Sequence, residues 1–285
     1  MSTALAAVAP FLACPVCGRG LELEERVLRC PAGHSFDLAR QGYASLLAGG
    51  SAGTGDDAAM VEARAAFLGA GHYAPLAQLL AELAADLTPD PGGLVAEAGA
   101  GTGTYLAAVL DRLPAAPGLA LDLSRFALRR AARAHPRMAA VATDLWRGLP
   151  LRAGAAALLL DVFAPRNAPE FRRVLRPDGA LLVVTPGPGH LAELTGPLGL
   201  LGVQPDKDAA VSAALAPGFA PVLTRTLDLR LRLSPAAAEA LVRMGPSAYH
   251  LDHDGLRARV AALGDPVQAT AAFTISGFRP GSAAE

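Results

Sequence analysis

The sequence predicts an α/β protein built on a doubly wound, mostly parallel sheet, preceded by a small N-terminal metal-binding module. Two observations predict the sheet: short apolar runs alternate with helical segments from residue 94 onward, and a glycine-rich turn follows the first of these runs. A third observation predicts the module, because all three cysteines of the 285-residue chain lie before residue 31. Alternation of this kind places crossover helices on both faces of a sheet.

Composition narrows the class of protein. The apolar content of 52% is ample for the core of one full-sized domain. The net charge of -1 argues against a protein that coats nucleic acid through bulk electrostatics. No uninterrupted apolar run approaches about 18 residues, so we expect no membrane span. An odd number of clustered cysteines fits a reducing compartment, and we therefore expect a cytoplasmic protein.

The N-terminal module is predicted to cover residues 11–45. It contains two short strand-like runs, 21–25 and 26–30, and a segment of this size cannot bury a core of its own. Tetrahedral zinc would hold it together, because two close pairs of residues have ligand spacing: Cys14, Cys17, Cys30 and His34. Three unrelated thiols and a surface histidine are the alternative.

The segment 46–57 is rich in glycine and serine, which predicts a flexible linker or loop before one large domain, 58–285. Residues 56–87 then show apolar side chains at helical spacing, interrupted by glycines and a proline. This pattern predicts two helices joined by a bend that carries His72 and Tyr73. These two residues could belong to a functional site, or they could equally be a hydrogen-bonded pair with a purely structural role.

A series of predicted parallel strands follows these two helices. The apolar runs are 94–99, 119–124, 156–163 and 180–186, and the helices between them lie around 104–112, 125–134 and 168–175. Sheets of this kind bind ligands at the carboxyl ends of their strands, near the point where the strand order reverses. The predicted site residues follow the strand ends.

The glycine-rich turn predicts a nucleotide-containing ligand. Glu97 ends the first strand and is followed by Gly99, Gly101 and Gly103, which allow positive φ and close approach of the backbone to a ligand. The second strand ends nineteen residues beyond Gly103 at Asp122, whose carboxylate can accept both hydroxyls of a ribose. The pattern is E-x-G-x-G-x-G rather than the dinucleotide pattern G-x-G-x-x-G, which favours S-adenosylmethionine.

These motifs resemble those of class I (Rossmann-like) methyltransferases. Together with the zinc ligands, the whole chain resembles the 23S rRNA (guanine-N1)-methyltransferases of the RlmA family, particularly their tylosin-type macrolide-resistance branch. The stretches that carry the resemblance span residues 14–194: "CPVC", "CPAGHSFDLARQGYASLL", "ARAAFLGAGHYAPL", "EAGAGTGTY", "LDLS" and "FAPRNAPEFRRVLRPDGALLVVTPGPGHLAEL". The region 195–265 matches the family only loosely.

The resemblance implies roles for individual residues. The four cysteine and histidine ligands would bind zinc in a zinc-ribbon-like module. Positions that contact S-adenosylmethionine in the family match Tyr73, Gly101, Thr102 and His190. Asp122 would hold the ribose, and Asp144 or its neighbour Thr143 would lie near the adenine. Relatives often have aspartate where this chain has Glu97, which could still reach the methionine amino group, and cysteine where it has Ala100. Relatives also suggest a homodimer, which the residues alone do not indicate.

A guanine substrate would require a base, because guanine N1 carries a proton and is buried in paired RNA. Asp161 ends the fourth strand near the expected acceptor position and is the candidate for this catalytic role. A strand-end carboxylate that caps local backbone is the alternative. Phe163 and Trp146 could stack on the flipped base, with packing in the core as the alternative for both.

Arginines are concentrated in one stretch of this otherwise neutral protein. Seven of them lie between Ser124 and Arg152, against a single acid, Asp144. The pattern is typical of a solvated helix face, or it marks a surface that contacts phosphates.

Three functions fit the sequence. The first is methyl transfer to a guanine of 23S rRNA. The second is methylation of a small molecule by an enzyme that has kept a zinc module, which the near-neutral charge and the loosely matching 195–265 region favour. The third is a zinc-dependent RNA-binding protein without a working cofactor site, which the intact glycine turn, Glu97 and Asp122 disfavour.

Overall fold

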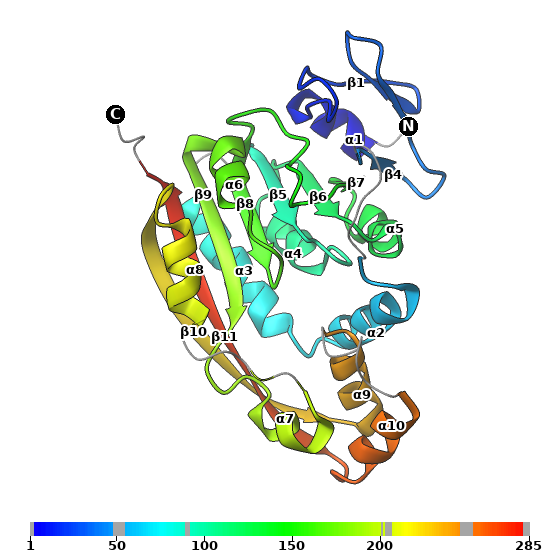
Figure 1. The fold of residues 1–285 in the computed structure, drawn as a ribbon, viewed down its shortest axis with the longest axis vertical. Helices are drawn as coiled ribbons and strands as arrows, with labels where there is room; N and C mark the ends of the chain where they lie inside the picture. Colours follow the sequence, from blue (N-terminus) through cyan, green and yellow to red (C-terminus); the bar gives the residue numbers. More distant parts are fainter. Residues whose placement is uncertain are drawn as a thin grey trace.

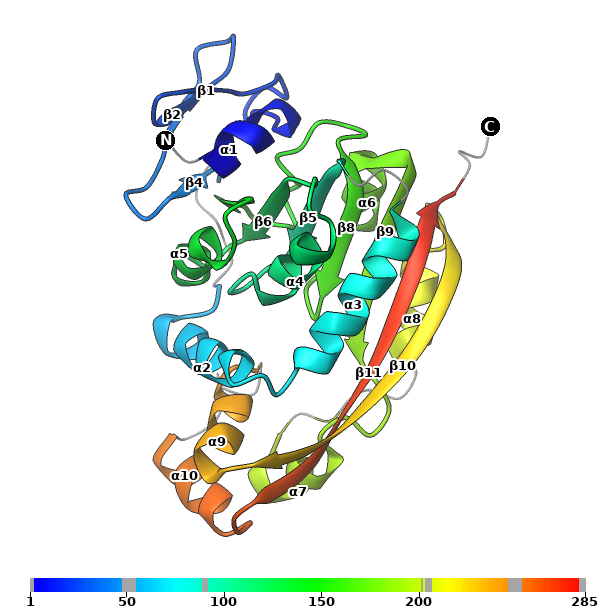
Figure 2. The same cartoon turned by 180° about the vertical axis from the view of Figure 1, so that it is seen from behind.

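The protein is described from a computed structural model, which defines residues 3–47, 55–88, 92–200, 202, 207–245 and 253–281. Most of the predicted linker, residues 48–54, lies outside the described residues. Figure 1 shows the fold and Figure 2 shows it from behind.

The central sheet has eight strands in the order β10-β11-β9-β8-β5-β6-β7-β4. From β4 to β9 neighbouring strands are parallel, and β11 and β10 then pair antiparallel. The chain runs from β5 outward to β7 and then returns to β8 on the other side of β5, so the order reverses between β5 and β8. The predicted doubly wound, mostly parallel sheet is confirmed. The parallel strands are β4 (Tyr43–Ser45), β5 (Leu94–Ala98), β6 (Gly118–Asp122), β7 (Met138–Ala142), β8 (Ala156–Val162) and β9 (Leu175–Pro186).

Helices cover both faces of this sheet because its strands are apolar on both faces. Alternate residues of β5 belong to different layers: Leu94 and Ala96 pack in one core cluster and Val95 in the other. The first layer is covered by α1 (Thr3–Val8), α6 (Ala168–Val174) and α8 (Lys207–Leu215). The second is covered by α3 (Ala74–Leu87), α4 (Thr104–Arg112) and α5 (Arg125–Ala134).

The helices expected from sequence are confirmed. Helices α4, α5 and α6 lie at the predicted positions, and α2 (Ala58–Gly69) and α3 flank the predicted bend. Three of these helices begin at a side-chain cap, because Asp57, Ser124 and Asn167 each accept a hydrogen bond from a backbone N–H in the first turn.

The N-terminal module has its own small sheet of β1 (Glu22–Glu24), β2 (Val27–Arg29) and β3 (Ser35–Asp37), all antiparallel. The next strand, β4, leaves this sheet and pairs parallel with β7 at the edge of the central sheet. An isolated bridge between Leu12 and Leu151 makes a further connection. The module is therefore joined to the central sheet by backbone pairing.

Of the remaining elements, the three helices lie at the opposite end of the molecule from the module, whereas the hairpin runs along the far edge of the central sheet (Figures 1 and 2). These elements are α7 (Ala192–Leu198), α9 (Pro235–Arg243), α10 (His253–Ala261) and a long hairpin of β10 (Phe219–Leu233) and β11 (Val267–Pro280). Among the described residues, none of the helices has the length and apolar character needed to span a bilayer.

Candidate functional site

A cavity of about 790 Å³ lies at the carboxyl ends of β5 and β8, covered by residues of α2, α7 and the end of α9. The reversal of strand order lies at this point, as predicted. Six of the predicted cofactor residues line the cavity: Tyr73, Glu97, Gly99, Gly101, Thr102 and His190.

The glycine turn has the backbone that the sequence predicted. Gly99, Gly101 and Gly103 have φ of 71°, 53° and 79°, and Gly103 is the N-cap of α4. A Cβ atom on Gly99 would lie 2.4 Å from the Cβ of Ala164, so a larger residue would displace the loop after β8. A Cβ on Gly101 would approach the Arg64 side chain at 3.3 Å. The turn therefore keeps its backbone open to the cavity, as a cofactor that packs on that backbone requires.

Glu97 lines the cavity from the end of β5. Its Oε2 accepts a hydrogen bond from the Leu106 backbone N–H at 3.2 Å, which joins β5 to α4. Burial raises the pKa of Glu97 well above its ordinary value, the Leu106 hydrogen bond opposes this, and the charges of Asp122 and Asp161 add to the increase. A cationic group in the cavity would therefore stabilise the ionised form of Glu97.

Asp122 holds the glycine turn in place. Its Oδ2 accepts from the Gly101 N–H at 2.8 Å and its Oδ1 accepts from the Ser124 N–H at 2.7 Å. Burial raises the pKa of Asp122, whereas these two backbone hydrogen bonds lower it. Each carboxylate oxygen has a second lone pair, so the residue can accept ribose hydroxyls while it fixes the turn.

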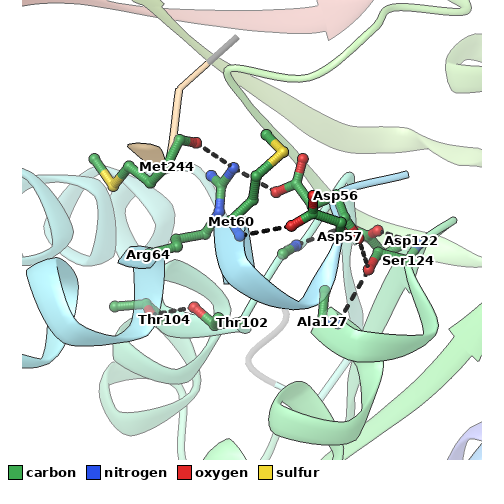
Figure 3. A network of polar contacts seen from close by, with 11 residues as sticks. Asp56, Asp57, Met60, Arg64, Thr102, Thr104, Asp122, Ser124, Ala127 and Met244 are labelled. Atoms are coloured by element: carbon green, nitrogen blue, oxygen red, sulfur yellow. Dashed lines mark hydrogen bonds and ion pairs between the residues drawn. The ribbon is translucent and has the colours of Figure 1, made fainter. Parts of the chain in front are cut away.

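A polar network, drawn in Figure 3, links three separate segments beside the cavity. Arg64 Nη2 donates to Asp56 Oδ2 at 2.6 Å and to the Met244 carbonyl at 2.9 Å. Ser124 Oγ donates to the Asp56 carbonyl at 2.6 Å. Arg64, Asp56 and Met244 all line the cavity. Sequence analysis missed these residues, because nothing in the local pattern distinguishes Arg64 from a solvated helix arginine.

Three rings that line the cavity, those of Tyr73, Phe163 and His190, pack around the buried ring of Phe273. The Phe273 ring lies 5.0 Å from that of Tyr73, 5.8 Å from that of Phe163 and 5.2 Å from that of His190. His190 Nδ1 lies 2.7 Å from the Ala272 carbonyl, which can only accept, so Nδ1 carries the proton. Phe163 is 39% exposed and has a φ of 57°, a conformation that is uncommon for non-glycine residues. The core alternative for Phe163 is therefore wrong.

Asp161 lies at the end of β8 with no exposed surface. Arg166 Nε lies 3.6 Å from its Oδ1. Burial raises the pKa of Asp161 well above its ordinary value, and the charge of Arg166 and the Ala164 backbone N–H oppose this increase. Arg166 is one of the described residues that line the cavity, whereas Asp161 is not.

Asp144 lies in a different cavity, of about 500 Å³, between the module and the central sheet. Cys14 and Arg152 line this cavity as well. Asp144 Oδ1 accepts from the Trp146 N–H at 3.1 Å, and the Trp146 side chain is 69% exposed, so the core alternative for Trp146 is wrong.

The four predicted metal ligands converge within the module. Their ligand atoms all lie within 4.8 Å of one another: those of Cys14, Cys17, Cys30 and His34. Cys17 Sγ lies 3.7 Å from Cys30 Sγ, and His34 Nδ1 lies 3.3 Å from Cys30 Sγ. Thiolates about 2.3 Å from a tetrahedral zinc would lie roughly 3.8 Å apart, so the geometry and the donor set fit zinc.

The thiols also differ in acidity. Burial raises the pKa of Cys14. Burial also raises the pKa of Cys30, but hydrogen bonds from the His34 and Ala32 backbones and from the His34 side chain outweigh it and lower the pKa to about 6. The thiolate that a metal requires is thus favoured at Cys30.

Comparison with known proteins places the chain among rRNA-modifying enzymes. The family model described as "RlmA, N-terminal", a zinc ribbon, matches residues 12–48. A Micromonospora griseorubida protein with the provisional name 23S rRNA (guanine-N1)-methyltransferase is 54% identical over 95% of this chain and 98% of its own length. The Streptomyces fradiae 23S rRNA (guanine(748)-N1)-methyltransferase is 48% identical over 96% of this chain and 98% of its own.

The fold is also found among solved structures. A chain from the complex of the Haloferax volcanii Trm112 methyltransferase activator with a methyltransferase matches 81% of this chain and all of its own, with a TM-score of 0.52 and 15% identity. Identity this low supports the fold alone. The identities to the two curated relatives, over nearly the full length of each protein, establish that the chain belongs to the family of 23S rRNA (guanine-N1)-methyltransferases.

Proposed function

We propose that this enzyme transfers the methyl group of S-adenosylmethionine to N1 of a guanine in a hairpin loop of 23S rRNA. The observation that carries the proposal is the glycine turn fixed by Asp122 on a cavity of about 790 Å³. It occurs in a chain 48% identical to a methyltransferase named for guanine 748 of 23S rRNA. We propose the corresponding guanine as the target.

The cofactor would supply an electrophilic methyl group, and the protein's task is to align donor and acceptor. In our proposal Gly99, Gly101 and Thr102 lie along the cofactor, Asp122 accepts the ribose hydroxyls and Glu97 faces the methionine amino group. Tyr73 and His190 complete the set, from the start of α3 and the segment after β9. Asp144 lines the other cavity, beside the module, so its predicted place near the adenine is left out of this proposal.

The target guanine must leave its base stack before it can react. Phe163 lines the cavity and is backed by the buried ring of Phe273, 5.8 Å away, and an exposed aromatic face of this kind can stack on an unpaired base. The exposed part of Phe163 offers the first contact. The guanine N1 atom would then face the methyl group without water between them.

Methyl transfer to guanine N1 releases its proton, which we propose passes to solvent water rather than to a protein base. Asp161, predicted for this role, has no exposed surface, whereas its neighbour Arg166 lines the cavity. We therefore propose that Asp161 is a positioning residue that holds Arg166, and that Arg166 orients the guanine through its carbonyl oxygen O6, an acceptor that arginine commonly binds.

We propose separate roles for the two domains, RNA contact for the first and methyl transfer for the second. The zinc module (11–45), joined by residues 46–57 to the methyltransferase domain (58–285), would contact the RNA loop. A homodimer, suggested by the family resemblance, and a cytoplasmic location, where ribosomal RNA is found, complete it. Light scattering of the purified protein measures its molar mass and so shows whether it is a dimer.

Primer extension tests the central proposal. Ribosomal RNA from cells with and without the gene would be extended across guanine 748, for which the Streptomyces fradiae relative is named, because N1-methylguanine blocks base pairing and stops the polymerase. We expect a stop at that guanine only with the gene present. Transfer of labelled methyl groups to small acceptors, but not to rRNA, would support the small-molecule alternative instead. Growth on tylosin-type macrolides would show whether the methylation confers resistance.

A further inference from the structure

Helix α5 carries a group of arginines and no acidic residue. Its buried residues are Ala127, Leu128 and Ala131, which pack inward. Its exposed and half-buried positions contain the basic face of α5, which we define as Arg125, Arg129, Arg130 and Arg133. The protein's overall charge is -1, so this concentration of positive charge is local.

The charges of this face are not neutralised by neighbours. Some exposed arginines elsewhere face an acid, as Arg29 faces Glu24 and Arg176 faces Asp178, whereas those of β10, such as Arg230, are in no ion pair among the described residues. Among the described residues, no ion pair involves an arginine of α5. A helix that only needed a polar surface would be stabilised by mixed charges at positions i and i+4. The uncompensated charge therefore favours an anionic partner.

An aromatic ring supports two of these arginines. The guanidinium carbons of Arg125 and Arg129 lie 5.0 Å and 5.5 Å from the centroid of the Phe126 ring. Contacts of this kind hold guanidinium groups in place and leave their charge and their N–H donors available. The face is thus partly ordered before it binds anything.

The position of α5 connects the two parts of the proposed site. At its N-terminus, Ser124 donates to Asp122 Oδ1 through its N–H and to the Asp56 carbonyl through Oγ, beside the cofactor cavity. Further along, Ala132 lies beside Gly42 of the module, where an added Cβ would be 3.7 Å away. Figures 1 and 2 both show α5 between the module and α2. The helix that carries the basic face therefore lies between module and cavity.

We propose that the basic face of α5 binds the phosphodiester backbone of the RNA substrate along the path from the zinc module to the cofactor cavity. This inference rests on the proposed function. Guanidinium groups bind phosphate oxygens in a bidentate manner, and backbone contacts fix the position of a nucleic acid without reading its sequence. An anionic membrane is a poorer partner, because the apolar side of α5 is buried in the core rather than available for insertion.

Salt-dependent binding tests the inference. A labelled transcript of the 23S rRNA segment around guanine 748 would be titrated by fluorescence anisotropy at several KCl concentrations. The triple variant Arg125→Gln, Arg130→Gln, Arg133→Gln is compared with wild type. The matched control is the triple variant Arg225→Gln, Arg230→Gln, Arg232→Gln, which removes three exposed arginines from β10 at the other edge of the sheet. Removal of one arginine–phosphate interaction should reduce the slope of log K against log salt by about 0.7, so we expect a reduction of about 2 for the α5 triple alone.

Cofactor titration by calorimetry shows that each variant is folded. If the triple variant is unstable, the single variant Arg130→Gln replaces it and should reduce the slope of log K against log salt by about 0.7. If the wild-type enzyme methylates the transcript but the α5 variants bind it with an unchanged salt slope, this inference is wrong and the proposed function stands. An equal reduction in the β10 control overturns it too, as does α5-dependent binding to phosphatidylserine vesicles without such binding to the transcript. A wild-type protein that neither binds nor methylates the transcript overturns the proposed function and this inference together.

Discussion

Arg64 and Asp56 form an ion pair beside the cofactor cavity, with 2.6 Å between Nη2 and Oδ2. Their side chains are only 26% and 25% exposed, so solvent screens this pair less than a surface pair. Arg64 also donates to the Met244 carbonyl at the end of α9. The pair therefore holds together segments that are far apart in the chain.

Replacing Arg64 by glutamine should weaken cofactor binding about tenfold, which corresponds to about 1.4 kcal/mol. The variant leaves Asp56 unpaired near Asp122, whose pKa Asp56 already raises and Arg64 lowers. It also removes the link to α9. Calorimetric titration with S-adenosylmethionine measures the change.

A double-mutant cycle provides the control for this first prediction. Asp56→Asn removes the unpaired charge, so the double variant Arg64→Gln, Asp56→Asn should bind the cofactor better than the sum of the two single effects implies. Additive effects would mean that the two side chains act independently, and would contradict the assigned role.

Glu97→Gln should stabilise the protein without cofactor. Between the ordinary pKa of 4.5 and its raised value in the folded protein, Glu97 keeps a proton that the unfolded chain has released. Stability from this group is therefore present at low pH and falls as pH rises through that window. Melting temperatures from about pH 5 to pH 8 should fall less steeply in the variant. An unchanged slope would contradict the buried, protonated state of Glu97.

Cys30→Ser should release the metal and destabilise the module. The three strands of the module are short, and their core includes the ligands Cys14 and Cys30 themselves. Bound metal would stabilise a module that is too small for a sufficient hydrophobic core, and removal of one thiolate ligand weakens that metal site. Elemental analysis after purification measures zinc, and thermal melting measures stability. Ser35→Ala, next to His34 but exposed, is the matched control and should retain its zinc.

Asp161→Asn and Arg166→Gln should lower kcat for RNA methylation by similar factors, and the double variant should be no slower than either. This follows because Asp161, with no exposed surface, would act through Arg166 at 3.6 Å. The pH profile of the rate should keep its shape in both variants. A direct role for Asp161 as the proton acceptor would instead show as a larger decrease in Asp161→Asn and a changed pH profile.

Local patterns were sufficient to predict the parts of the site that depend on nearby residues. The glycine turn needs positive φ at alternate positions, and metal ligands need close spacing, so both leave a signature within a few residues. The parallel strands are apolar on both faces, which is why runs such as 156–163 stand out.

Features that depend on distant partners could not be predicted. Arg64 and Met244 are 180 residues apart in the chain, and no local signal joins them. The strand β4 has three residues and exists only because β7 lies beside it. Asp161 was found by its place at a strand end, but whether its carboxylate reaches the cavity depends on how the loop to Arg166 folds over it.

The pairing of β4 with β7 affects how this enzyme can be engineered. A fragment that starts at residue 58 would leave β7 as an outer strand with open amide groups, and removal of α1 would uncover the apolar residues that contact Leu5 and Val8. Exposed strands of this kind template aggregation. The module can therefore be transferred to another enzyme only if that enzyme has an unpaired edge strand with which β4 can pair. Deleting the module from this enzyme requires another segment that pairs with β7.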